Sequence, residues 1–202
     1  MVEEKEAQAE EKTSKEQFSL FTFLFETVKF AVIALLIVIP FRIYIAQPYI
    51  VSGASMEETF KSGTYLIVDQ FTYRFDEPER GDVIIFRLPQ DPSKFLIKRV
   101  IGLPGETVKI TQGEVTITKP GTEPFTLAEP YVVPDNFMDI RIKTLKDTEY
   151  FVMGDNRPES LDSRIWGPLP QENIIGEAFF ALFPLNDMAL HPGRHSFEEI
   201  TP

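Results

Sequence analysis

The chain contains no cysteine and only two histidines, and both shortages narrow its chemistry. Without cysteine it forms no disulfide, no thiolate metal site and no cysteine nucleophile, although the redox compartment stays undecided. The two histidines, His191 and His195, lie together near the C-terminus in a segment that also contains proline and glycine. A Ser-His-Asp triad would have to draw its base from that segment, because such triads are defined by geometry and not by sequence order.

Basic residues are outnumbered. Lys and Arg total 20 against 31 Asp and Glu, which gives a formal net charge of −11. Nucleic-acid binding relies on clustered Lys and Arg at the phosphates, so this balance argues against a nucleic-acid partner. The sequence shows neither a metal-ligand spacing nor a glycine-rich phosphate loop, and we expect no metal and no cofactor.

A length of 202 residues, 43% of them hydrophobic and 25% charged, is typical of one globular domain with an appendage. The glutamate-rich N-terminus is too polar to bury a core, so it is expected to be disordered. The predicted parts are an acidic tail over residues 1–17, a membrane anchor helix over 18–46, a β-rich domain over 47–184 that would carry any catalytic site, and a C-terminal tail over 185–202.

The anchor is predicted from the one apolar stretch of membrane length. Residues 30–41 are apolar throughout, and extending them to 27–46 reaches the ~20 residues that a helix needs to cross a bilayer. Lys29 and Arg42 then lie near the ends, where long side chains reach the headgroups. A buried or interfacial helix is the alternative. Lysines before the span outnumber the basic residues close after it, which favours an N-terminus on the inside.

Beyond the anchor, short β-branched and aromatic segments alternate with turn residues, a pattern typical of strands. No long helical period appears after residue 47, so we expect a mainly antiparallel β domain. Four prolines between residues 119 and 148 indicate a long stretch with little regular structure. The predicted strands are 64–71, 83–88, 95–101, 107–110, 115–118, 150–153 and 174–183.

Ser55 and Lys98 are the candidate catalytic residues. A serine hydroxyl is a weak nucleophile until a neighbouring base takes its proton, and a lysine can be that base. Strand alternation puts Lys98 on one face with Leu96 and Val100. If that face is buried, desolvation lowers the pKa of the lysine and lets its neutral amine accept a proton. The alternatives are a turn hydroxyl for the serine and a solvent-facing, edge-strand lysine.

Four segments together resemble the type I signal peptidase family, which consists of membrane serine peptidases with a Ser-Lys dyad. In the family's order they are residues 52–60 (SGASMEETF), 80–87 (RGDVIIFR), 97–105 (IKRVIGLPG) and 154–164 (GDNRPESLDSR). The resemblance implies an N-terminal transmembrane helix followed by an antiparallel β-sheet domain of the signal-peptidase kind. It implies cleavage of signal peptides from exported preproteins after small residues, commonly Ala-x-Ala. The cleavage would pass through an acyl-enzyme on Ser55, with Lys98 as general base.

The implied partners are signal-peptide-bearing preproteins and membrane lipid. The implied location is the cell membrane, with a single span and the catalytic domain on the extracytoplasmic side.

The resemblance also assigns supporting residues. The Ser160 hydroxyl would bind and orient the lysine amine, and Asp162 would support the catalytic pair without carrying a proton. The Ser55 backbone N–H would be one oxyanion donor. Many family members supply the second donor from a serine two residues earlier, but here that position is Gly53. A backbone N–H, a water or Ser52 then remains open as the second donor.

The small-residue pocket would be lined by apolar side chains that flank the nucleophile and the base in sequence. These candidates are Tyr49, Val51, Met56, Leu96 and Ile97. Core packing is the alternative for each of them.

Two other functions are compatible with parts of the pattern. A membrane-tethered, non-catalytic β domain that binds peptides or proteins would have no need of Ser55, Lys98 and Ser160. A self-cleaving repressor-type Ser-Lys protease would need a DNA-binding domain or a cleavable arm, and no membrane span.

Overall fold

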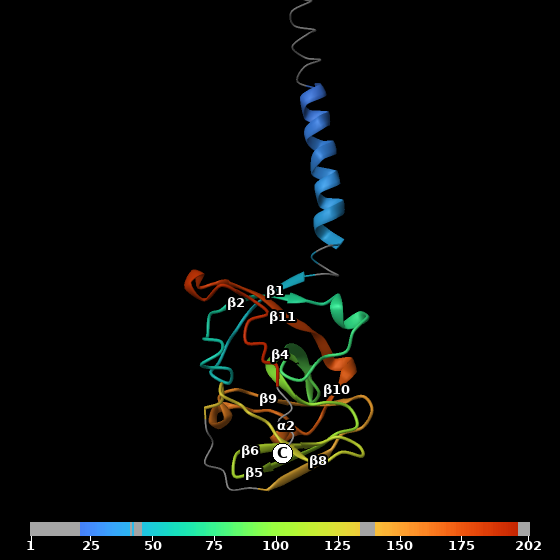
Figure 1. The fold of residues 1–202 in the computed structure, drawn as a ribbon. Helices are drawn as coiled ribbons and strands as arrows, with labels where there is room; N and C mark the ends of the chain where they lie inside the picture. Colours follow the sequence, from blue (N-terminus) through green and yellow to red (C-terminus); the bar gives the residue numbers. More distant parts are fainter. Residues whose placement is uncertain (1–20, 41, 43–45, 134–139, 198–202) are drawn as a thin grey trace, which may run out of the picture. The chain divides into compact units, whose positions relative to one another are not determined.

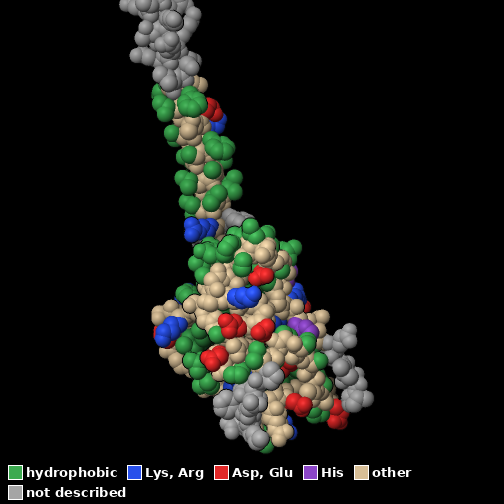
Figure 2. Space-filling view, turned by 90° about the vertical axis from the view of Figure 1, so that its left-hand side faces the viewer, with side chains coloured by type: hydrophobic (Ala, Val, Ile, Leu, Met, Phe, Trp, Pro, Cys, Tyr) green, Lys and Arg blue, Asp and Glu red, His purple; other side chains and the backbone are tan. Residues whose placement is uncertain are grey.

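The computed structural model describes residues 21–40, 42, 46–133 and 140–197, and the chain divides into two units, Met1–Tyr44 and Ile45–Pro202. The expected acidic tail over residues 1–17 lies outside the described residues. In the first unit a helix spans Phe21–Pro40, which is long and apolar enough to cross a membrane. Figure 2 shows hydrophobic side chains along this helix.

The helix begins and ends earlier than the stretch 27–46 that hydropathy favours. Two charges are accommodated within it, because Lys29 donates to Glu26 one turn earlier at 3.3 Å. Ala46 is already the first residue of a strand.

The second unit is mainly β, with two sheets in which every strand pair is antiparallel (Figure 1). The prediction of a mainly antiparallel β domain is therefore confirmed. In spatial order the larger sheet consists of β1 (Ala46–Ile50), β2 (Tyr65–Asp69), β11 (Ile174–Phe183), β3 (Val83–Leu88), β4 (Asp91–Gly102), β9 (Glu149–Met153) and β10 (Leu169–Pro170), with β12 (Ala189–Leu190) paired to β11. The smaller sheet consists of β7 (Phe125–Thr126), β6 (Glu114–Thr118), β5 (Thr107–Thr111) and β8 (Arg141–Thr144).

The helical elements of this unit are short. They are the α-helix α2 (Ser163–Trp166) and the 3-10 helices η1 (Thr72–Arg74), η2 (Arg157–Glu159), η3 (Gln171–Asn173) and η4 (Leu185–Asp187).

Each of the seven predicted strands overlaps an observed one, but five observed strands were not predicted: β1, β7, β8, β10 and β12. Two of these, β7 and β8, lie within the stretch 119–148 that the prolines suggested was irregular. All four residues of β8 are exposed, so no side of it has the apolar periodicity that marks a strand in sequence.

The two faces of strand β4 pack against different hydrophobic clusters. Leu96 and Val100 belong to one hydrophobic cluster, together with Ile84 and Val152. Ile97 packs on a second cluster, which contains Val51, Met56 and Phe60, and Ile101 belongs to a third, which contains Val108 and Phe151. Side chains alternate along a strand, so Lys98 shares the face of Leu96 and Val100 while Arg99 points to the opposite face.

Residues that follow β12 fold back onto the domain. The His191 N–H donates to Phe179 O at 2.7 Å, and the His195 N–H donates to Gly81 O at 3.3 Å. Phe197 packs against the third cluster. The described part of the expected C-terminal tail therefore has fixed contacts with the sheet.

Candidate active site

Ser55 lies on the loop between β1 and β2, and this loop is fastened at both ends. The Val51 N–H donates to Thr64 O at 2.9 Å, and the Gly63 N–H donates to Val51 O at 2.8 Å. Within the loop, the Phe60 N–H donates to Met56 O at 2.7 Å. Val51 and Met56 are buried, so the residues on either side of Ser55 are anchored in the core.

Lys98 reaches this loop from β4. Its Nζ donates to Ser55 Oγ at 2.5 Å and to Ile97 O at 2.8 Å, and the residue is only 2% exposed. Burial lowers the pKa of Lys98 to about 8, against the opposing charges of Asp162 and Asp155. An amine with this pKa is partly neutral near pH 7, so it can accept a proton from the hydroxyl that it contacts.

Asp162 organises the polar residues beside this pair. Its buried carboxylate accepts hydrogen bonds from Ser160 Oγ at 2.7 Å, from the Gly154 N–H at 3.0 Å and from Arg164 Nε at 2.8 Å. It also caps α2 by accepting from the Arg164 N–H. Among the described residues the acceptors of Lys98 Nζ are Ser55 Oγ and Ile97 O, and the Ser160 hydroxyl is directed to Asp162 instead. The arrangement thus differs from the direct Ser160–lysine contact that the resemblance implies.

Two residues that sequence analysis did not single out lie against the nucleophile's backbone. The Asn156 N–H donates to Ser55 O at 3.1 Å, and Asn156 Nδ2 donates to Ala54 O at 3.0 Å. A Cβ on Gly154 would lie 2.4 Å from Ser55 O and 2.3 Å from Ser160 Oγ, so only glycine fits there. Their place in the segment 154–164, beside Ser160 and Asp162, was the available signal.

The five predicted pocket residues are divided between two hydrophobic clusters. Val51 and Met56 are members of a single cluster on which Tyr49 and Ile97 pack, whereas Leu96 packs on another. Tyr49, Leu96 and Ile97 are partly exposed, whereas Val51 and Met56 are 6% and 1% exposed. Tyr49 also contacts an aromatic ring that sequence analysis missed, Phe95, at a centroid distance of 5.8 Å.

Gly53 has a φ of +100° and nothing within 4 Å of the position that a Cβ would occupy. A side chain would therefore fit the space but strain the backbone. Glycine is favoured at position 53 by the backbone conformation. This conformation does not identify the second oxyanion donor.

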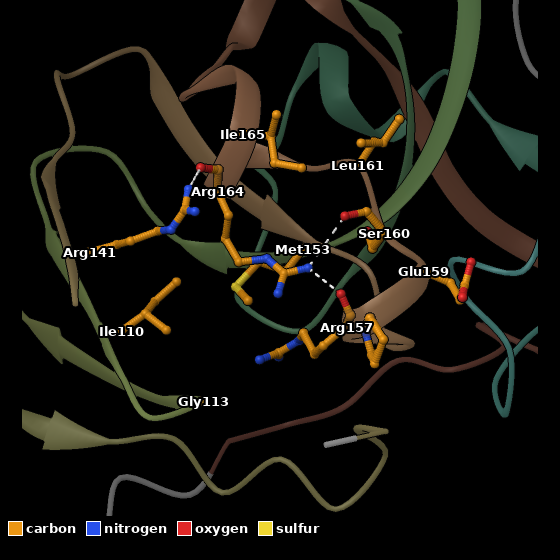
Figure 3. A pocket seen from close by; sticks show the side chains of 11 residues that line it. Ile110, Gly113, Arg141, Met153, Arg157, Glu159, Ser160, Leu161, Arg164 and Ile165 are labelled. Atoms are coloured by element: carbon orange, nitrogen blue, oxygen red, sulfur yellow. Dashed lines mark hydrogen bonds between the residues drawn. The ribbon is translucent and has the colours of Figure 1, made fainter. Parts of the chain in front are cut away.

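A cavity of about 410 Å³ adjoins the supporting residues (Figure 3). Ser160 lines it together with Met153, Arg157, Leu161 and Arg164, but neither Ser55 nor Lys98 does. The cavity therefore lies against the residues that support the catalytic pair and not against the pair itself.

The histidines are engaged elsewhere. His191 Nδ1 lies 3.0 Å from Glu177 Oε1, and the ring of His195 stacks edge-on against Tyr131 and Phe197. The base in contact with Ser55 is Lys98, so the described geometry gives no support to a Ser-His-Asp triad. Among the described residues, no group of three or more His, Asp or Glu side chains is arranged to hold a metal ion.

Comparisons with known proteins identify signal peptidases as similar to this chain. The model of the family "Signal peptidase, peptidase S26" matches residues 24–183. The chain is 37% identical to the probable signal peptidase I-1 of Synechocystis sp., over 80% of this chain and 84% of that protein. It is 35% identical to signal peptidase I T of Bacillus subtilis, over 93% of this chain and 98% of that protein. The crystal structure of a signal peptidase I from Enterococcus faecalis matches 50% of this chain and 97% of its own at 31% identity, with a TM-score of 0.43.

These matches favour a signal peptidase over a repressor-type protease and over a non-catalytic binding domain. They extend across the segments that carry Ser55 and Lys98 and cover most of the second unit. The chain belongs to the signal peptidase family, peptidase S26, and is a serine peptidase.

Proposed function

We propose that this chain is a membrane-anchored serine endopeptidase that removes N-terminal signal peptides from exported preproteins by cutting after small residues. The observation that carries the proposal is the 2.5 Å contact between Lys98 Nζ and Ser55 Oγ, made by a buried amine whose pKa is lowered to about 8. A buried lysine beside a serine hydroxyl is costly for stability, because its charge is desolvated. The arrangement makes chemical sense as a nucleophile with its base.

The proposed reaction follows from these two groups. Neutral Lys98 takes the proton of Ser55 Oγ as that oxygen attacks the scissile carbonyl carbon. The resulting oxyanion accepts a hydrogen bond from the Ser55 N–H and from a second donor. Collapse breaks the C–N bond, and the Lys98 ammonium returns its proton to the departing amine. Lys98 then takes a proton from a water that attacks the ester carbonyl, and on collapse it returns this proton to Ser55 Oγ, which frees the signal peptide's carboxylate and restores Ser55.

Supporting residues maintain this geometry without taking a proton. Ser160, Asp162 and Gly154 form one hydrogen-bonded group behind the pair. Asp162 also favours the charged form of Lys98 electrostatically, which limits how far burial lowers the pKa.

The substrate would bind along the free side of β4. Leu96 and Ile97 pair with β3 on one side, but on the other side β9 pairs with β4 only from Arg99 onward. No described strand occupies the remaining edge next to Lys98, so an extended peptide can add to it through backbone hydrogen bonds. The partly exposed Tyr49 and Ile97 are then available to contact the small side chains before the cut.

The test is direct cleavage. Detergent-solubilised protein should convert a purified preprotein that carries an Ala-x-Ala site into its mature form, and mass spectrometry should locate the cut after the second alanine. The same preprotein with phenylalanine in place of that alanine should be cleaved at least tenfold more slowly, since a pocket sized for a methyl group excludes a ring. Cleavage at other sites, or equal rates for the two substrates, would refute the specificity.

The anchor and its sidedness form a separate proposal. The helix Phe21–Pro40 would hold the protein in the cell membrane, with the domain that follows on the extracytoplasmic side. Protease added to intact spheroplasts should digest that domain while a cytoplasmic marker protein survives. Digestion of the domain only after lysis would show that it lies on the cytoplasmic side.

A further inference from the structure

The segment 192–197, here called the C-terminal strap, contacts the buried residues that fasten the Ser55 loop to β4. We propose that the strap is a positioning element for catalysis, which holds Ser55 and Lys98 in register through Arg99 and Asp155. The inference rests on the proposed roles of Ser55 and Lys98, and it gives a role to residues that the mechanism above does not use.

Arg99 is the centre of this contact. It follows Lys98 on β4, points to the opposite face and is 1% exposed. Its Nε and Nη2 donate to the two carboxylate oxygens of Asp155 at 2.9 and 2.6 Å. Its Nη1 donates to Gly81 O at 2.9 Å and also to Gly193 O of the strap. A buried guanidinium needs all its acceptors, so the strap's carbonyl completes the environment that keeps Arg99 in place.

Asp155 transmits this order to the nucleophile loop. Thr59 Oγ1, four residues after Ser55, donates to Asp155 Oδ2 at 2.5 Å. The next residue after Asp155 is Asn156, which binds Ser55 O and Ala54 O. Polar contacts and the peptide linkage between Asp155 and Asn156 thus connect the strap through Arg99 to the backbone of Ser55.

The strap approaches these residues closely because two glycines allow it. A Cβ on Gly193 would lie 2.3 Å from Thr59 Cγ2. In the segment that the strap contacts, a Cβ on Gly81 would lie 1.7 Å from His195 O. The strap backbone therefore packs against the Thr59 side chain at Gly193 and against the Gly81 backbone at His195, and a side chain at either glycine would push the strap away from Arg99.

Contacts made by the residues after Gly193 hold the strap down. Arg194 pairs with Glu79 at 2.6 Å and with Asp82 at 3.2 Å. Beyond it, Phe197 packs on the hydrophobic cluster that contains Ile101 and stacks against His195 at a centroid distance of 4.8 Å. Loss of the strap would admit water to Arg99 and loosen the Asp155 clamp. A displacement of about 1 Å between nucleophile and base can cost about 100-fold in rate.

The test compares two alanine variants of the full chain, Gly193→Ala and Gly121→Ala. Both glycines have a φ of +75°, but nothing lies within 4 Å of a Cβ at Gly121. The pair therefore shares the backbone strain and differs in the clash with Thr59. In the preprotein assay, kcat of Gly193→Ala should fall at least tenfold relative to Gly121→Ala, while KM changes less than twofold. Circular dichroism at the assay temperature gives the folded fraction, and kcat is expressed per folded molecule.

A second variant covers the case in which Gly193→Ala does not fold. Phe197→Ala releases the end of the strap without touching Arg99, and the exposed Phe75→Ala is its control. We expect at least a threefold loss of kcat per folded molecule at unchanged KM. Control-like kcat in every folded strap variant, or a loss confined to KM, would overturn the inference. Failure of the unaltered protein to cleave any preprotein would instead refute the proposed function.

Discussion

Replacing Ser55 with alanine should lower kcat by roughly 10⁴-fold or more, because the variant keeps the substrate site but has no oxygen to form the acyl-enzyme. The fold should survive. The deleted oxygen makes a hydrogen bond to Lys98 Nζ at 2.5 Å, and Lys98 retains Ile97 O as an acceptor. Loss of one such bond costs about 1 kcal/mol of unfolding free energy.

The measurement is conversion of a preprotein over time by mass spectrometry, with thermal unfolding followed by circular dichroism. Ser62→Ala is the matched control, since Ser62 is an exposed serine of the same loop. It should retain full activity. Undiminished processing by Ser55→Ala would show that another residue attacks the substrate.

Replacing Lys98 should have an effect of similar size. Lys98→Met removes the base, and Lys98→Arg replaces it with a guanidinium that stays protonated throughout the accessible pH range. Both should lose roughly 10⁴-fold in kcat. In the unaltered protein kcat should rise with pH around the lowered pKa of about 8, because only the neutral amine accepts the Ser55 proton. Lys94→Arg, an exposed position on the same strand, should remain active.

Near-normal turnover by Lys98→Arg would be incompatible with a general-base role. A pH profile that is flat between 6 and 10 would be equally incompatible.

The same lysine should reduce the stability of the fold below pH 8. Its pKa falls from 10.5 in the unfolded chain to about 8 in the folded one, so the unfolded state binds more protons between these values. The free energy of unfolding should therefore increase as pH rises from 8 to 10.5, by about 3 kcal/mol from this group. Lys98→Met should lack this contribution to the pH dependence and be more stable than the unaltered protein at pH 7. Parallel stability curves for the two proteins would contradict a lowered pKa.

Sequence patterns predicted the strands that have one buried face and missed those without one. The strand β3 was found because four of its six residues are buried and β-branched or aromatic. The wholly exposed β8 has no such pattern, and it is placed only by pairing with β5. Its pairing depends on residues distant in sequence, which local periodicity does not contain.

The site shows the same division. Lys98 could be proposed because its neighbours Leu96 and Val100 predict a buried strand face, and its burial follows from that pattern. The strap could not be proposed, because its contacts with Arg99 and Gly81 are made by the Gly193 carbonyl and the His195 N–H. Backbone groups are common to every residue, so no side-chain pattern marks them.

The adjacency of Lys98 and Arg99 ties the chemistry of this protein to how its chain is assembled. The pairing of Ile84 with Lys98 and of Val83 with Arg99 determines which cation faces Ser55. A slip of one residue would turn β4 over and offer the serine a cation that never gives up its proton. Such a chain would contain the same two cations, and it would have no base. Correct alignment of the β3–β4 hairpin is thus required for catalysis. A misaligned chain would be inactive even while it remained folded.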